Sequence, residues 1–214
     1  MHRPFAAAIA NSVSTCVFYH LETSKVLMQI GENNMTNAYA GLNIEVVTAF
    51  MKAYLYFEIY GGFSHRTMYA IFRTCLASIL CTLVSSPINV YRSRVQVEAN
   101  VPEIVMGKFT YHTIIESVLY GLIKNIPSSV VKYQVYERII NCLGASLLTG
   151  LICGFIASLV TYIVCAPLDY LYISRICGIN PTIDNVFCGI KYGGLHSALG
   201  SGLAHAILEF LTKI

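Results

Sequence analysis

Three short strings of residues recur in an otherwise apolar chain and carry the side chains that could do chemistry. They occupy residues 20–25 (HLETSK), 87–92 (PINVYR) and 167–172 (PLDYLY). In a helix, the third and sixth positions of such a string lie on adjacent turns of one face. The first string holds an acid and a base there, and a charge buried at the end of a membrane helix must find a partner. The strings therefore predict ion pairs between helices.

Other kinds of chemistry find little support in the sequence. It offers no nucleophile–base pair, metal-ligand cluster or glycine-rich phosphate loop in a suitable setting. The eight cysteines include no CxxC pair, and most lie in apolar runs, which favours buried free thiols over a zinc site or disulfides. The net charge of +3 is too small and too scattered for a nucleic-acid surface. We therefore expect no enzyme activity, no cofactor, no metal and no nucleic-acid partner.

Composition and apolar runs predict the elements that position these strings. The chain is 56% hydrophobic and 12% charged. A soluble domain carries about 25% charged residues, so we expect much of the surface to face lipid. Three charge-free runs approach the span of about 17–25 residues that crosses a bilayer: residues 4–19, 74–91 and 140–168, the last with a helix start near Gly144. Weaker apolar segments follow them at about 41–60, 115–136 and 194–211.

The alternation of strong and weak segments predicts an internal repeat of two helices. We expect an all-α membrane protein with six transmembrane helices in a single domain. Its three two-helix repeats, with pseudo-threefold symmetry around a central cavity, are expected at about residues 1–64, 65–138 and 139–214. Lys124 and Lys132 interrupt one weak segment, and a charge facing lipid costs about 2.5–3.5 kcal/mol. We expect these lysines to face the interior, a wet cavity or a membrane edge.

The three strings resemble the signature Pro-x-Asp/Glu-x-x-Lys/Arg of the mitochondrial carrier family, which occurs once per repeat. The weak segments end in phrases similar to the family's second signature, aromatic-acidic-x-x-basic, at 57–60 and 133–137, with Phe210 at the matching place. The resemblance covers essentially the whole chain. It implies a monomer in the mitochondrial inner membrane, with both termini facing the intermembrane space. It also implies contact with membrane lipid such as cardiolipin.

In the carrier family the acid of each string pairs with the base of the next repeat, and the ring of pairs forms the matrix-side gate. The resemblance implies a matrix gate built from six residues: Glu22, Lys25, Asn89, Arg92, Asp169 and Tyr172. Glu22 would then meet Arg92, and Asp169 would meet Lys25. The two remaining positions have both lost their charge, which favours a neutral hydrogen bond between them. Independent change at two exposed positions is the alternative explanation.

Further features of the family can be followed at both ends of the expected bundle. Gln29 and Gln96 match its glutamine brace, which hydrogen-bonds across an ion pair beneath the gate, whereas the third repeat has Ile176 there. His20 replaces the first signature proline, so the first helix is expected to be straighter. At the opposite end the basic residues are lost. An aromatic plug could replace the second set of ion pairs there, formed by Phe57, Tyr60, Tyr133 and Tyr136.

Carriers bind substrate midway along the even helices, about one turn before a proline. The resemblance therefore implies a set of substrate-binding residues in which Lys124 is the main contact: Lys124, Asn125, Thr48, Ser201 and Thr15. Snorkelling of Lys124 to an interface is the alternative. Weaker candidates are His196, His205 and Arg73. The set suits a small anionic or polar solute such as phosphate, a carboxylate or a nucleotide, although it lacks the dense positive charge expected for a nucleotide.

The chain also departs from the family, and this leaves other interpretations open. The loops that normally hold a short matrix-surface helix are shortened, as at residues 30–40. We expect a transporter that works by alternating access, as an exchanger or a uniporter. The alternatives are a carrier-fold protein without transport activity, serving as a receptor, insertase or scaffold, and an unrelated polytopic protein with chance motifs.

Overall fold

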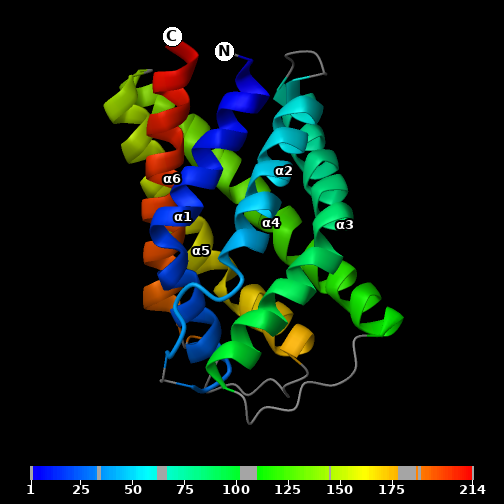
Figure 1. Ribbon diagram of the computed structural model, residues 1–214. Helices are drawn as coiled ribbons and strands as arrows, with labels where there is room; N and C mark the ends of the chain where they lie inside the picture. The colour runs from blue at the N-terminus through cyan, green and yellow to red at the C-terminus, as the bar shows by residue number, and fades with distance from the viewer. Residues whose placement is uncertain are drawn as a thin grey trace.

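The computed structural model describes residues 2–32, 35–61, 67–101, 110–144, 146–177, 187 and 189–213. Within these residues the chain forms six α-helices and no strand (Figure 1). Their bounds are α1 (Arg3–Gln29), α2 (Leu42–Gly61), α3 (Thr67–Asn100), α4 (Tyr111–Leu143), α5 (Leu147–Cys177) and α6 (Ile190–Lys213). The expected all-helical fold is thereby confirmed. α4 ends five residues after the boundary expected for the second repeat at about 138.

Local sequence explains where the long helices begin and end. α1 begins with Pro4 in its first turn, where a missing N–H costs nothing. Thr110 precedes α4 and accepts a hydrogen bond from the N–H of Thr113, which caps the first turn. Gly144 ends α4 with φ +76°, a conformation that favours glycine. The charge-free run is therefore divided: Gly144 terminates one helix, and α5 begins only at Leu147.

Three helices carry an interior proline: Pro87 in α3, Pro127 in α4 and Pro167 in α5. A proline removes one backbone hydrogen bond and bends a helix. α3 changes direction in its second half, which swings across the lower end of the bundle (Figure 1). α1 has His20 at the corresponding place and runs unbroken through it.

The six helices form a closed ring. Each packs against its neighbours in sequence, and α6 packs against α1; α1, α3 and α5 also contact one another. Both ends of the chain lie at the same end of the bundle (Figure 1). A side chain at Gly154 of α5 would lie 2.9 Å from both the Ser201 carbonyl oxygen and His205 Nδ1 of α6. The Gly150–Gly154 pair thus permits close packing of these two helices.

Large apolar side chains lie on the outside of this ring, and small or polar ones lie within it. All six helices expose large apolar residues, among them Phe5, Val47, Phe72, Leu119, Val164 and Leu199. The buried set is dominated by alanine, serine and threonine and also contains four charged residues of the predicted gate: Glu22, Lys25, Arg92 and Asp169. Soluble proteins show the opposite distribution, and exposed apolar surface of this extent marks contact with lipid or a partner.

Three helices in the described part of the chain are long and apolar enough to cross a membrane: Ala70–Asn100, Tyr111–Leu143 and Leu148–Cys177. They lie in α3, α4 and α5 and indicate a membrane protein. Six spans and a threefold repeat stay predictions, because α1, α2 and α6 do not reach the same apolar content.

Two apolar clusters fill the two ends of the bundle. Near the termini, alanines of α1 pack against Ala204 and Leu208 of α6, with Phe57 of α2 beside them. At the other end, Val26 of α1 meets Val90 of α3 and a group from α5 that includes Tyr172, Ile173 and Ile176. The space between these clusters is polar and holds the candidate site.

Candidate functional site

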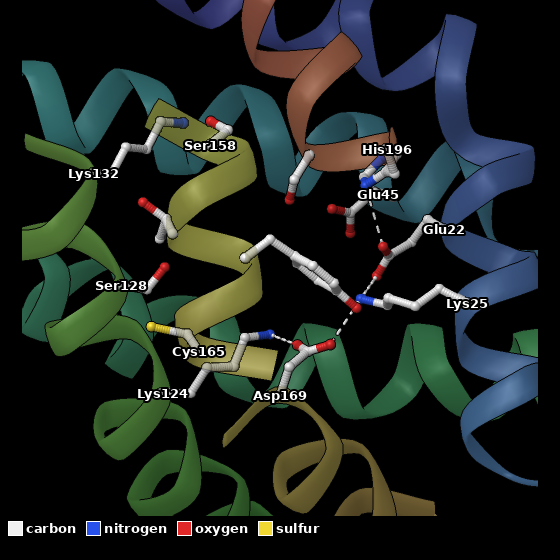
Figure 2. Close-up of a pocket in the computed structure, with 13 residues that line it drawn as sticks. Glu22, Lys25, Glu45, Lys124, Ser128, Lys132, Ser158, Cys165, Asp169 and His196 are labelled. Carbon is white, nitrogen blue, oxygen red and sulfur yellow. Dashed lines mark hydrogen bonds and ion pairs between the residues drawn. The ribbon is translucent and has the colours of Figure 1, made fainter. Parts of the chain in front are cut away.

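A cavity of about 230 Å³ lies between the helices, and most of its lining residues are polar (Figure 2). It is lined from α1, α2, α4, α5 and α6 by Glu22, Lys25, Glu45, Lys124, Ser128, Lys132, Ser158, Thr161, Tyr162, Cys165, Asp169, His196 and Ser197. Two facing helices give most of this lining. α4 presents Lys124, Ser128 and Lys132, spaced four residues apart on one helix face. α5 faces it with a second stripe that runs from Ser158 to Asp169.

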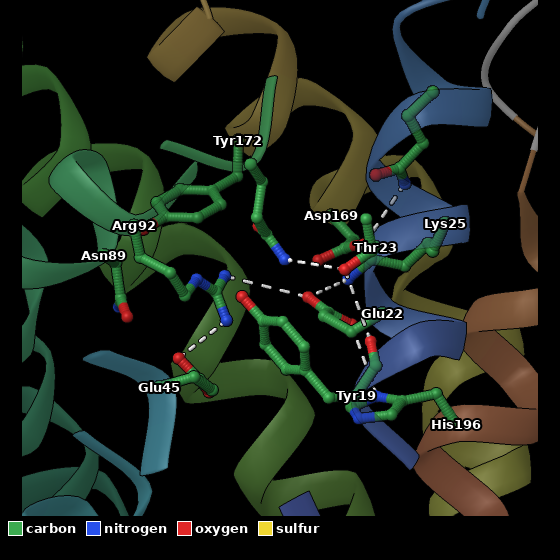
Figure 3. Close-up of polar contacts among 12 residues, drawn as sticks. Tyr19, Glu22, Thr23, Lys25, Glu45, Asn89, Arg92, Asp169, Tyr172 and His196 are labelled. Carbon is green, nitrogen blue, oxygen red and sulfur yellow. Dashed lines mark hydrogen bonds and ion pairs between the residues drawn. The ribbon is translucent and has the colours of Figure 1, made fainter. Parts of the chain in front are cut away.

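One end of the cavity is closed by ion pairs between α1, α3 and α5 (Figure 3). The Lys25 ammonium lies 2.8 Å from Glu22 Oε1 and 3.3 Å from Asp169 Oδ2. Arg92 lies 3.7 Å from Glu22 Oε1 and 2.7 Å from Glu45 Oε2 of α2. The structure thus brings together both of the ionic contacts expected from the strings. Glu45 is a further member that the resemblance did not indicate.

Asp169 is the most heavily used acid of this cluster. Its side chain is 4% exposed, and its Oδ2 forms an ion pair with Lys25. Lys124 of α4 contacts the other oxygen, Oδ1. Gln29 donates a hydrogen bond of 3.2 Å to Oδ2, the oxygen that Lys25 also approaches. The Lys124 ammonium also lies 4.8 Å from the ring centre of Tyr172, within range of a cation–π contact. Asp169 therefore joins α1 and α4 to α5 at one point.

Glu22 is the second shared acid, and it reaches α6. His196 Nδ1 lies 3.2 Å from Glu22 Oε2, while Lys25 and Arg92 approach Oε1 (Figure 3). His196 was only a weaker candidate in the sequence. Because it is the contact from α6, the polar cluster extends over all six helices of the ring.

The expected hydrogen bond between Asn89 and Tyr172 is replaced by other contacts. Asn89 accepts a hydrogen bond of 3.0 Å from Lys52 of α2 and donates one to Ser85. The Tyr172 hydroxyl lies 3.4 Å from Ser117 Oγ of α4. Each of the two residues is therefore bonded to a side chain of an even-numbered helix, α2 or α4, instead of to the other. The cluster is therefore a network rather than a ring of three pairs.

The two glutamines differ in what they hold. Gln29 donates to the carboxylate of Asp169, the acid of the Lys25–Asp169 pair, while its own Oε1 has no hydrogen-bond partner in the described structure. A brace across the whole ion pair therefore stays a prediction. Gln96 donates to the Thr23 hydroxyl over 3.3 Å and links α3 to α1 beside the charges. Ile176, at the third position, is 2% exposed and lies in the apolar cluster with Val26 and Val90. An apolar contact thus stands where the third glutamine would be.

Among the expected substrate-binding residues, Lys124 alone lines the cavity. Asn125 donates to Thr82 of α3 over 2.9 Å, because adjacent residues of a helix point about 100° apart. Thr48 is 1% exposed, and its hydroxyl donates a hydrogen bond to the carbonyl oxygen of Ile44 in the same helix. Ser201 lies against His205, at the packing interface with α5. Thr15 lies two helical turns before Glu22, outside the lining set. These four residues do not line this cavity, and their role in substrate binding stays a prediction.

The end of the bundle near the termini carries aromatic contacts. Tyr60 of α2 and Tyr133 of α4 have ring centres 6.1 Å apart, and Tyr136 lies 4.9 Å from the ring of His205. Phe57 packs in the apolar cluster of α1 and α6. Arg73 covers the Tyr60 ring at 4.7 Å. The four aromatic residues predicted for this end thus join α2, α4 and α6.

Sequence reasoning missed most of the cavity wall. Ser128, Ser158 and Thr161 went unnoticed, although Lys124, Ser128 and Lys132 fall at offsets of four residues and could have been recognised as one face. The corresponding signal on α5 is the polar series that ends at Asp169. These two polar faces become a cavity wall only when α4 and α5 pack with the faces opposite each other.

Positive charge exceeds negative charge in this region. Five bases and three acids of the described residues belong to the cavity and the polar cluster at its end: Lys25, Lys52, Arg92, Lys124, Lys132, Glu22, Glu45 and Asp169. Seven cysteines are free, and Cys188 lies outside the described residues. No group of three potential metal ligands forms within the part of the chain that the structure describes. The arrangement is suited to holding an anion.

A search against models of known protein families finds none that matches the chain, and a search of curated proteins finds no match.

Proposed function

We propose that the protein is a transporter that moves a small anionic solute across a membrane by alternating access. The observation that carries the proposal is the gate: two ionic contacts expected from the repeated strings, Glu22–Arg92 and Lys25–Asp169, lie at one end of a polar cavity. They join α1 to α3 and α5, so separating these helices would open the cavity at that end. The mitochondrial inner membrane is the compartment that the carrier resemblance suggests.

The placement of charges supports six membrane crossings rather than three. α1, α2 and α6 fall short in apolar content because they carry residues such as Glu22, Glu45 and His196, and these side chains line the cavity. Their outer faces are apolar, as Val17, Val47 and Leu195 illustrate. A charge that faces a wet interior does not bear the full cost of contact with lipid.

Substrate can act on the gate through Lys124. This side chain is 25% exposed, lines the cavity and contacts Asp169. An anion that enters the cavity competes with Asp169 for the same ammonium group. Its binding energy then offsets part of the cost of breaking the network, and a state that binds the anion more tightly gains population. The unliganded network would hold the gate closed.

Uptake by reconstituted liposomes tests this function. We expect saturable uptake of phosphate or a small carboxylate into liposomes that contain the protein and an internal anion. Lys124→Gln should reduce uptake at least tenfold because it removes the link between substrate and gate. Lys191→Gln, which removes the same charge from the exposed start of α6, should leave uptake unchanged.

The contrary result is equally informative. Absence of uptake for every anion, with protein that melts cooperatively, would overturn the proposal. It would favour a carrier-like membrane protein that serves as a receptor, insertase or scaffold.

A further inference from the structure

The cavity wall contains a second lysine, Lys132, that takes no part in the gate. It lies eight residues after Lys124 on the same face of α4, which places it about 12 Å farther along the helix axis. Its ammonium group points toward Ser158 of α5, at the end of the cavity away from Asp169 (Figure 2). Two lysines of one helix thus lie at opposite ends of one cavity.

Lys132 lacks a counter-charge of its own. Its side chain is partly buried, and it has no ion-pair or hydrogen-bond partner among the residues that the structure describes. A cation held away from bulk water without an anion is costly. Lys25, Arg92 and Lys124 are each matched by at least one carboxylate.

Hydroxyl groups around Lys132 are also left without partners. Ser158 is 4% exposed, lines the cavity, and its oxygen is buried with no hydrogen bond in the described structure. Ser128, one turn before Lys132, likewise makes no hydrogen bond with the described residues. Buried hydroxyls are normally satisfied, so an orphan beside an unpaired cation points to a ligand that is bound in another state.

From these observations we propose that Lys132, Ser128 and Ser158 form an anion-binding subsite for a small oxyanion, a phosphate or a carboxylate group. The ammonium supplies charge, and each hydroxyl can donate one hydrogen bond to an oxygen of the ligand. The inference rests on the proposed transport function and identifies where its substrate binds. The subsite lies on the side of the cavity away from the gate, so it holds the anion while the gate network stays intact.

The size of the cavity restricts the ligand. Pockets for drug-sized molecules measure about 300–1,000 Å³, and this cavity measures about 230 Å³. Inorganic phosphate or a short dicarboxylate fits such a space, whereas a nucleotide exceeds it. A dicarboxylate bound at Lys132 extends toward Ser128 and the centre of the cavity.

Calorimetric titration of the detergent-purified protein tests the subsite, with inorganic phosphate and succinate as separate probes and ATP as the large anion. Lys132→Gln should raise the Kd of the bound oxyanion at least tenfold, and Lys132→Arg should stay within about threefold of the unaltered protein. Ser158→Ala removes one donor without changing charge and should raise the Kd about three- to tenfold. Lys191→Gln is the control for charge and should change nothing.

The outcomes separate this inference from the function on which it rests. If the unaltered protein takes up oxyanions but Lys132→Gln and Ser158→Ala bind them as tightly, the subsite is refuted and transport stands. If the unaltered protein neither binds nor transports any oxyanion, both proposals fail. Binding of ATP in preference to phosphate and succinate would overturn the assignment to a small oxyanion. Lys132→Arg keeps the positive charge, so binding that is retained in this variant and lost in Lys132→Gln is attributed to the charge and not to the exchange of the side chain.

Discussion

The cations at the two ends of the cavity differ in their partners. At the proposed gate, Lys25 is shared between two carboxylates at 2.8 and 3.3 Å, and Arg92 likewise contacts two. At the far end, Lys132 makes no ion pair or hydrogen bond with the described residues. All the acids of the cavity, Glu22, Glu45 and Asp169, belong to the gate.

This difference indicates a division of labour along α4 and α5. A network whose charges are mutually satisfied resists opening and excludes a free anion. An unmatched cation does the reverse, because only a ligand can complete its coordination. Substitutions at the gate should therefore act mainly on stability, and those at the far end mainly on binding.

The largest effect is expected from Asp169→Asn. The substitution removes the negative charge that pairs with Lys124 and Lys25, and it leaves one acceptor oxygen where the carboxylate offers two to Lys124, Lys25 and Gln29. Breaking a buried pair in this way costs about 3–5 kcal/mol. Denaturant unfolding of the protein in detergent measures the loss. Glu58→Gln, at a half-exposed acid on α2, is the control and should change stability by less than about 0.5 kcal/mol.

Glu22→Gln should destabilise the protein less, by about 2–3 kcal/mol, in the same unfolding experiment. Both cations at this acid have a second partner: Lys25 keeps Asp169, and Arg92 keeps Glu45. Loss of stability equal to that of Asp169→Asn would contradict the idea that sharing protects the network.

The two glutamines offer a finer comparison within the gate. Gln29→Leu removes a hydrogen bond to a carboxylate and should cost about 1.5–2 kcal/mol, whereas Gln96→Leu removes one to a hydroxyl and should cost about 0.5–1 kcal/mol. Thr23 keeps its bond to the Ala38 carbonyl when Gln96 is lost. Thermal melts of both variants decide this, and the reverse order would show that Gln29 does not brace the ion pair.

The smallest change in stability, with the opposite sign, is expected for Lys132→Gln without ligand. Removing an unmatched cation should stabilise the protein by up to about 1 kcal/mol, while Lys124→Gln should destabilise it. Melting curves recorded without added anion test this contrast. A marked loss of stability in Lys132→Gln would mean that the lysine has a structural partner.

The sequence predicted those parts of the molecule that depend on pattern along the chain. The apolar runs predicted six helices. The strings that recur at 20–25, 87–92 and 167–172 predicted the contacts Glu22–Arg92 and Lys25–Asp169. Position within a helix was harder to predict. Asn125 was chosen because it adjoins Lys124, but the helical rotation of about 100° turns it toward α3.

Partners that differ between helices could not be predicted from a repeat. Asn89 and Tyr172 were expected to meet, because the threefold pattern pairs equivalent positions. Lys52 and Ser117 reach them from the even helices instead. Such contacts depend on the length and direction of side chains across an interface, and no spacing in a single sequence encodes them.

The closed ring has a consequence for how the chain is connected. α1 and α6 pack together, and both ends of the chain lie at one end of the bundle. A short peptide could therefore join these ends, and the chain could be opened between α2 and α3. Such a circular permutant keeps every helix contact and begins with α3. The order in which the helices emerge during synthesis would change, while the assembled cavity stays the same.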